Sequence, residues 1–171
     1  MKKNLVLTGM MGVGKSTIGK RLAKSLKLKF VDVDKAIEEK EKNTVSEIFN
    51  NKGESYFRKI EKKITLEVLK KSELVIALGG GAFINSSIRK EVLNSCTSIW
   101  LDLNVKSILL RLKNVNKRPL LNQNNLEKTL NKIYLDRKRI YNESNFRIKC
   151  ESKNIKVIID RIIKIYENSK N

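Results

Sequence analysis

The segment Gly9–Thr17 has residue types and a spacing that suit the binding of a polyphosphate. It reads Gly-Met-Met-Gly-Val-Gly-Lys-Ser-Thr, matches the pattern G-x-x-x-x-G-K-[ST] and directly follows a short apolar run. Glycines let backbone N–H groups wrap phosphate oxygens, and the N-terminus of a helix that begins here adds positive potential. Lys15 is expected to reach the terminal phosphates and Ser16 to ligate Mg²⁺. The segment therefore predicts nucleoside triphosphate binding by Gly12, Val13, Gly14, Lys15, Ser16 and Thr17.

Two carboxylates, Asp32 and Asp34, follow the next apolar run. If a strand continues through them, alternation points both side chains the same way. Mg²⁺ needs oxygen ligands, and a hydroxyl that accepts a phosphoryl group needs an anionic residue to orient it, so one carboxylate is available for each task. The structural alternative is that Asp34 merely caps a helix that begins at Lys35.

Three consecutive glycines, Gly79–Gly81, end a later apolar run. Glycines are costly to order, so a triplet needs a physical reason. Close approach of a ligand to the backbone is one such reason, and a flexible turn between a strand and a helix is the alternative.

The amino-acid composition limits the kinds of catalytic and metal sites that the chain can form. The 171 residues include no histidine, which excludes Ser-His and Cys-His catalytic arrangements and histidine metal sites. Cys96 and Cys150 lie far apart in apolar stretches without a C-x-x-C pair, so we expect small core residues rather than a disulfide or a zinc site. Any chemistry has to use carboxylates, cations and backbone groups.

The formal net charge of +19 raises nucleic acid as a partner, but the basic residues are not clustered. Acidic residues interrupt them, as in Lys59–Lys63, and no run reaches five or six like charges. We expect solvated lysines on outer helix faces, no nucleic-acid partner, and a field that favours an anionic small substrate. The apolar run Leu5–Leu7 is too short for a signal peptide or a membrane span, so we expect a cytoplasmic protein with no membrane partner.

The elements that position these residues alternate between strands and helices. Short apolar runs predict five strands, at 5–8, 29–31, 74–78, 97–101 and 146–150. Helical periodicity separates them, as where Ile18, Leu22, Ala23 and Leu26 share one face. The alternation predicts an α/β fold: one domain over 1–171, a three-layer sandwich with a five-stranded parallel sheet.

Two connections, from Asp32 to Glu73 and from Asp102 to Asn145, are longer than a crossover needs. Ligands of open parallel sheets bind beyond the carboxyl ends of the strands, where long connections can build a pocket and a lid. We expect residues 33–73 to form a substrate-binding insertion. The polar, asparagine-rich stretch 112–125 around Arg118 is the candidate lid.

Taken together, the motifs resemble those of the shikimate kinase family, small P-loop enzymes of the nucleoside monophosphate kinase-like fold. Beyond the phosphate loop and the Asp-x-Asp pair, the family order continues through Ile48-Phe49, Gly53-Glu54, Phe57-Arg58-x-x-Glu61, Gly79–Gly81 and Arg118-Pro119-Leu120-Leu121. The resemblance covers roughly Leu5 to Tyr141. It implies ATP-dependent phosphorylation of the shikimate 3-hydroxyl, on the route to chorismate and the aromatic amino acids, with one Mg²⁺. We expect the chain to act as a monomer.

The resemblance also implies how the acceptor is held. Arg58 and Arg137 would grip the shikimate carboxylate, which suits a planar guanidinium better than an ammonium. Asp34 would hold the ring hydroxyls, including the one that is phosphorylated, and Gly79, Gly80 and Gly81 would contact substrate. Glu61 would orient Arg58; its alternative is an exposed pair that contributes little.

On the nucleotide side, the family pattern places Arg118 over the transferred phosphoryl group and Arg111 beside the nucleotide. Lys15, Asp34 and Arg118 would then be the catalytic residues, and Ser16 and Asp32 would serve the metal.

Several alternatives stay open at this stage. Arg111 is equally compatible with a solvated cation on a helix. The family's Pro-Leu-Tyr element after Arg137 reads Lys138-Arg139-Ile140-Tyr141 here, so Arg139 could replace Arg137 in the pocket. The stretch 151–154 is no more than a plausible adenine contact. The rival functions are a gluconate or nucleoside monophosphate kinase, a nucleic-acid-binding NTPase and a catalytically silent relative.

Overall fold

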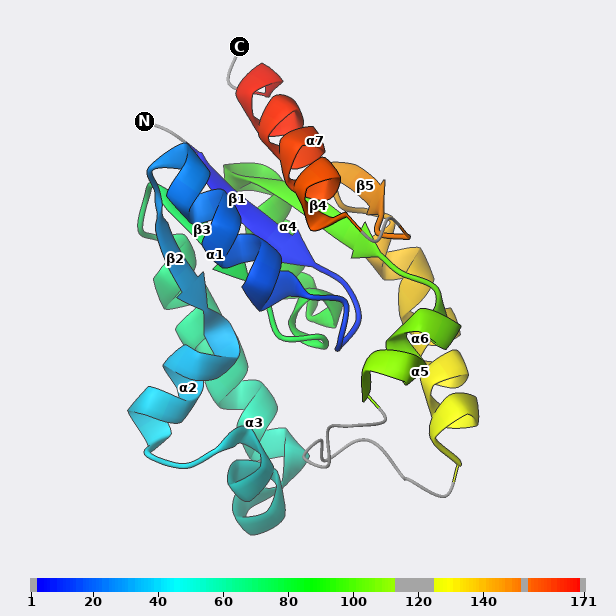
Figure 1. Cartoon of the computed structure of the whole chain (residues 1–171). Helices are drawn as coiled ribbons and strands as arrows, with labels where there is room; N and C mark the ends of the chain where they lie inside the picture. The colour runs from blue at the N-terminus through cyan, green and yellow to red at the C-terminus, as the bar shows by residue number, and fades with distance from the viewer. Residues whose placement is uncertain (1–2, 113–124, 152–153, 170–171) are drawn as a thin grey trace.

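A five-stranded parallel sheet organises the protein in a computed structural model that describes residues 3–112, 125–151 and 154–169 (Figure 1). The strand order is β2-β3-β1-β4-β5, and every neighbouring pair is parallel. All five expected strands form, with ends that differ from the predicted ones by no more than a residue or so. They are β1 (Asn4–Thr8), β2 (Lys29–Asp32), β3 (Leu74–Ala77), β4 (Cys96–Asp102) and β5 (Phe146–Lys149).

Within the described residues, seven α-helices and a short 3₁₀ helix accompany these strands, and all but the last helix, α7, lie between two strands in the chain. On one face of the sheet α1 contacts β2 and β3 and packs beside α7, whereas α4 lies behind the sheet, against β4 and α3 (Figure 1). The predicted three-layer sandwich is therefore confirmed. The helices are α1 (Lys15–Leu26), α2 (Val33–Glu41), α3 (Val45–Leu69), η1 (Ala82–Ile84), α4 (Ser86–Ser95), α5 (Val105–Leu112), α6 (Leu126–Tyr141) and α7 (Ile155–Asn168).

The apolar faces read from the sequence are the faces that pack. In α1, Ile18, Leu22 and Ala23 are buried, and Leu26 packs partly buried beside them. Gly19 lies against Phe30, since a Cβ at Gly19 would stand 2.4 Å from the Phe30 ring. This contact seats α1 directly on the sheet, so that its N-terminus points at the carboxyl ends of the strands.

Both cysteines are buried free thiols, as expected of core residues. Burial raises the pKa of the Cys150 thiol to about 12, so the thiol stays protonated and unreactive at neutral pH.

The long first connection folds into α2 and α3. Thr44 starts α3 with a reciprocal capping box, in which its hydroxyl accepts from Glu47 N–H while the Glu47 carboxylate accepts from Thr44 N–H. Gly53, at a φ of 81°, kinks α3 near its first third. The segment after the kink runs back toward the sheet and carries Arg58 and Glu61 to its carboxyl edge.

The positive charge is spread over the surface. Nearly every lysine that the structure describes is exposed, Lys15 and Lys62 being half-buried. Among the described helices, none is long and apolar enough to cross a membrane.

Candidate active site

The phosphate loop lies between the central strand β1 and α1. Gly9, Gly12 and Gly14 all adopt positive φ, at 132°, 76° and 100°, so a side chain at any of them would be strained. At Gly9 a Cβ would also stand 2.5 Å from the Leu101 carbonyl oxygen. Lys15 folds back over its own loop and donates to the carbonyls of Gly9 (2.8 Å) and Met10 (2.9 Å). The ammonium is thereby held over the loop that would wrap a phosphate.

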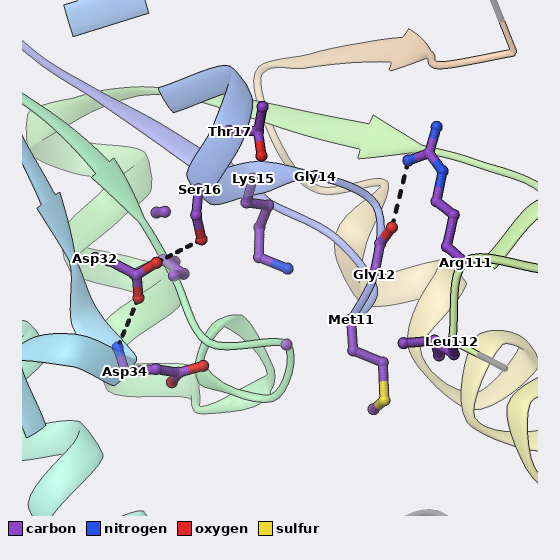
Figure 2. Close-up of a pocket in the computed structure, with 13 residues that line it drawn as sticks. Met11, Gly12, Gly14, Lys15, Ser16, Thr17, Asp32, Asp34, Arg111 and Leu112 are labelled. Carbon is purple, nitrogen blue, oxygen red and sulfur yellow. Dashed lines mark hydrogen bonds between the residues drawn. The ribbon is translucent and has the colours of Figure 1, made fainter. Parts of the chain in front are cut away.

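A pocket of about 280 Å³ opens where the carboxyl ends of β1, β2 and β3 meet (Figure 2). It is the location that an open parallel sheet offers a ligand. Most of the predicted nucleotide and metal residues line it, together with Leu112 from α5. The lining residues are Met11, Gly12, Gly14, Lys15, Ser16, Thr17, Asp32, Asp34, Ala77, Leu78, Gly80, Arg111 and Leu112.

Asp32 joins the phosphate loop to α2. Its Oδ2 accepts from Ser16 Oγ at 2.5 Å, and its Oδ1 accepts from the backbone N–H of Asp34 at 3.1 Å (Figure 2). The same Oδ1 also accepts from the backbone N–H of Lys35 at 3.4 Å. Asp32 is thus the N-cap of α2, and the alternative that Asp34 caps this helix is wrong. The expected strand alternation is also wrong, because the helix begins at Val33 and Asp34 lies in its first turn. Both carboxylates nevertheless line the pocket.

The Ser16 hydroxyl and the Asp32 carboxylate fit a magnesium ion. Both supply hard oxygen atoms, which Mg²⁺ prefers, and they already lie within hydrogen-bond distance beside the phosphate loop. In the part of the chain that the structure describes, no group of three or more Cys, Asp or Glu side chains forms a metal cluster. A small ligand set of this kind suits a metal that is shared with substrate phosphates and keeps several waters.

Asp34 and Glu61 meet at Gly79. A Cβ on Gly79 would lie 2.6 Å from Asp34 Oδ1 and 2.7 Å from Glu61 Oε1, so only glycine lets both carboxylates approach. Glu61 is 2% exposed, which rules out the alternative of a solvated surface pair. Burial raises the pKa of Glu61, an effect that Arg58 opposes and Asp34 reinforces.

Arg58 is held by two carboxylates of its own helix. Its Nη1 donates to Glu61 Oε2 at 2.7 Å, and its Nε and Nη2 donate to Glu54 Oε1 at 3.2 and 3.1 Å. Burial lowers the pKa of Arg58, but Glu61 and Glu54 outweigh it and leave a net rise, so the guanidinium is always charged. At Gly81 a Cβ would lie 2.6 Å from Arg58 Nη1. The lack of side chains in the glycine triplet therefore leaves room for Asp34, Glu61 and Arg58, in addition to any contact with a ligand.

Arg137 reaches the same triplet from α6. Its Nη1 donates to the Gly80 carbonyl at 2.9 Å, and the Tyr141 hydroxyl donates to that oxygen as well. Arg139 is exposed on α6 instead. Of the two arginines left open by the sequence, Arg137 is the one at the site.

Arg111 lies against the phosphate loop. Its Nη1 donates to the Val13 carbonyl (3.0 Å) and to the Gly12 carbonyl (3.3 Å; Figure 2), although α5 is distant in sequence. A second pocket, of about 370 Å³, lies beside these contacts. Its lining includes the phosphate loop, Arg111 and the start of α7: Gly12, Val13, Gly14, Thr17, Ile18, Arg111, Cys150, Ile155 and Ile158. Arg111 is therefore more than a cation on a solvated helix face.

Some predictions fall outside the described residues. Residues 113–124 of the 112–125 candidate lid, Arg118 among them, lie outside the described residues. So do residues 152 and 153 of the candidate adenine stretch. At the described edge of that stretch, Asn154 caps α7 by accepting from Lys156 N–H at 3.0 Å.

Among the polar side chains described at the site, Glu54 and Tyr141 carried no predicted role. Glu54 could have been found from its i, i+4 spacing to Arg58, which places both on one helix face. Tyr141 is likewise four residues after Arg137, so a helical reading of α6 would have put the two side by side.

Comparison with known proteins points to one family. The family model described as shikimate kinase matches residues 11–167. A curated relative named shikimate kinase, from Sulfurihydrogenibium sp. (strain YO3AOP1), is 42% identical over 161 residues, which are 94% of this chain and 96% of the relative.

Solved structures agree with this result. A shikimate kinase from Acinetobacter baumannii in complex with shikimate superimposes with a TM-score of 0.94 at 31% identity, covering 98% of this chain and 94% of that one. A gluconokinase from Sinorhizobium meliloti 1021 superimposes with a TM-score of 0.61 at 15% identity, covering 99% and 96%. The second likeness shows a shared fold alone.

Proposed function

The chain belongs to the shikimate kinase family, and we propose that the residues around the glycine triplet and the phosphate loop perform this family's reaction in the following way. The reaction transfers the γ-phosphoryl group of ATP to the 3-hydroxyl of shikimate. One observation carries the assignment of roles: Asp34, the Arg58–Glu61 pair and Arg137 converge on Gly79–Gly81, next to the phosphate loop.

The substrate carboxylate binds between Arg58 and Arg137. The two guanidinium groups approach adjacent glycines, Arg58 at Gly81 and Arg137 at Gly80, so an anion placed there meets both. Each planar guanidinium can offer paired N–H groups to a carboxylate. Glu54 and Glu61 hold Arg58 in place before substrate arrives, which reduces the entropy lost on binding.

Asp34 orients the ring hydroxyl that attacks the phosphoryl group. Its carboxylate lines the phosphate-loop pocket, so a hydroxyl bound to it faces the nucleotide. A carboxylate acceptor aligns the attacking oxygen and takes its proton as the new P–O bond forms.

The phosphate loop and Lys15 bind the nucleotide phosphates, and Arg111 adds positive charge beside Gly12 and Val13. Ser16 and Asp32 hold one Mg²⁺, which neutralises charge on the phosphate oxygens when it is bound. Because the transition state is loose, the acceleration comes mainly from positioning and from these charges.

The proposal extends to two segments of the chain, to the oligomeric state and to the location in the cell. Residues 33–73 act as the substrate-binding segment, since they carry Asp34, Arg58 and Glu61. Arg118, in the 112–125 lid, stabilises the transferred phosphoryl group; the support for this role is the sequence motif alone. The protein acts as a monomer in the cytoplasm; the support is that one chain supplies all the described site residues and that both thiols are free.

The test is an assay of ADP release with Mg²⁺-ATP and shikimate, gluconate or CMP as the acceptor. We expect turnover with shikimate alone. Arg58→Ala should cripple it, whereas Arg21→Ala, at an exposed arginine of α1, should not. Turnover with gluconate or CMP in place of shikimate would overturn the assignment of the acceptor site.

A further inference from the structure

The carbonyl of Gly80 accepts two hydrogen bonds from α6. One comes from Arg137 Nη1 at 2.9 Å and the other from the hydroxyl of Tyr141. The two donors lie one helical turn apart and therefore face the triplet together. Arg137 has a role in the proposed function, but Tyr141 has none yet.

Tyr141 is built to hold this bond. The residue is fully buried, at 0% exposure, and its ring packs 6.0 Å from the ring of Trp100 on β4. Burial raises the pKa of its hydroxyl, against the opposing effect of Arg137, so the group stays a neutral donor at physiological pH. A buried hydroxyl that donates its one hydrogen to a single backbone oxygen restricts the movement of that oxygen.

The oxygen belongs to a peptide that needs fixing. Gly80 and Gly81 have no side chains to restrict rotation of the peptide that joins them, so an isolated triplet would sample many orientations. A trans peptide directs its N–H opposite to its C=O, and none of the described peptide bonds is cis. Holding the Gly80 carbonyl toward α6 therefore turns the Gly81 N–H away from α6.

The Gly81 N–H is a backbone donor placed where a substrate group could accept from it. Within the described part of the chain, no backbone carbonyl accepts from the N–H of Gly80 or Gly81. Arg58 lies close to Gly81, so an anion drawn to its guanidinium arrives near this N–H. Two donors on the carbonyl, one of them charged, also polarise the peptide and make its N–H a stronger donor.

We propose that Tyr141 is a positioning residue, whose buried hydroxyl locks the Gly80–Gly81 peptide so that the Gly81 N–H, on the side away from α6 and near Arg58, is prearranged to donate to the substrate carboxylate. The inference rests on the proposed function, because it refines how the acceptor is bound. It assigns the main effect of Tyr141 to shikimate binding, because its hydroxyl bonds to the triplet. An effect on the nucleotide comes only through Gly80, which lies beside the backbone N of Met11 in the phosphate loop.

The test compares Tyr141→Phe with Tyr166→Phe. Tyr166 is an apt control because it is also fully buried and its hydroxyl donates to a backbone carbonyl, that of Lys3, at 2.5 Å, on α7 and away from the site. Both variants keep the ring and lose one such bond, so their melting temperatures should fall by similar amounts.

The kinetic result separates positioning from stability. We expect Tyr141→Phe to raise the KM for shikimate by about three- to tenfold, the usual effect of losing one hydrogen bond, and to raise the KM for ATP by a smaller factor. Tyr166→Phe should leave both KM values as they are. A shikimate KM that moves no more in Tyr141→Phe than in Tyr166→Phe overturns the inference, as does an equal rise in both of its KM values.

An NMR readout keeps this test independent of activity. The ¹⁵N–¹H resonance of Gly81 should shift and broaden in Tyr141→Phe and stay in place in Tyr166→Phe. Failure of wild-type protein to turn over shikimate would refute the proposed function, whereas an unmoved Gly81 resonance in Tyr141→Phe would refute the locking of the peptide.

Discussion

Arg58 and Glu61 form an ion pair one turn apart on α3, with 2.7 Å between Arg58 Nη1 and Glu61 Oε2, and the glutamate side of the pair is almost wholly buried. Two charged neighbours therefore act in opposite directions on the pKa of Glu61: the Arg58 cation lowers it, and the Asp34 carboxylate, across Gly79, raises it. Burial outweighs the cation, and the pKa of Glu61 lies above its ordinary value. This balance makes the site sensitive to pH.

The first prediction concerns the pH dependence of stability. Because folding raises the pKa of Glu61, the folded chain binds more protons than the unfolded chain above pH 4.5, and this group's contribution to the free energy of unfolding falls as pH rises through the raised pKa. Glu61→Gln lacks that titration. In urea titrations, wild type should lose stability relative to Glu61→Gln as pH increases from 4.5, until Glu61 is fully ionised. A difference that is flat or grows with pH would contradict the raised pKa.

The second prediction concerns Arg58→Lys. Lysine keeps the charge but loses the planar donor fork that binds Glu54, Glu61 and a carboxylate together. The KM for shikimate should rise about 10- to 100-fold, with a much smaller change in kcat, because the carboxylate is held equally in the ground and transition states. Steady-state kinetics with the matched control Arg21→Lys measures this. A lowered kcat at unchanged KM would place Arg58 at the reacting group instead.

The third prediction uses the space around Gly79. In Gly79→Ala the new methyl group meets Asp34 Oδ1 and Glu61 Oε1 at under 3 Å, so the carboxylates must move. We expect kcat/KM for shikimate to fall by about 100-fold or more, as a displacement of about 1 Å can cause. Steady-state kinetics with shikimate measures this fall, and a thermal melt of the same variant shows how much stability the crowding costs. An unchanged kcat/KM would contradict the close approach of the two carboxylates to Gly79.

Local patterns account for most of what could be predicted of the fold. Strands such as β1 and β3 are buried along their whole length and so appear in the sequence as short apolar runs, and the phosphate-loop motif marks the start of α1. The helix start at Val33 was missed, because the Asp-x-Asp pair reads equally as the end of a strand. Only the bonds from Asp32 to the next turn decide it.

The contacts between elements could not be read in the same way. The burial of Glu61 depends on Gly79 and Asp34, and the seat of Arg111 depends on a loop about a hundred residues away. The choice of Arg137 over Arg139 depends on which side of α6 faces the triplet. The sequence supplied the right residue types for these places, but their partners are set by tertiary packing.

The fourth prediction concerns Lys15→Ala. Removing the ammonium takes a positive charge from the phosphate loop, and kcat should fall by about 100- to 1,000-fold, as for loss of one electrostatic contact to the transition state. The melting temperature should change little, because Lys15 is only half-buried. Lys20→Ala, at an exposed position of the same helix, should behave as wild type. Unchanged turnover in Lys15→Ala would refute the role of the loop.

The last prediction separates two tasks of Asp32. Asp32→Asn removes the charge beside Ser16 but keeps an oxygen that caps α2, and asparagine is as good an N-cap as aspartate. The Mg²⁺ concentration for half-maximal activity should therefore rise about 10- to 100-fold while the melting temperature stays near that of wild type. Asp32→Ala should show the same metal defect and also lose about 1 kcal/mol of stability with the cap. An Asp32→Asn variant with a normal Mg²⁺ requirement would show that Asp32 serves only to start the helix.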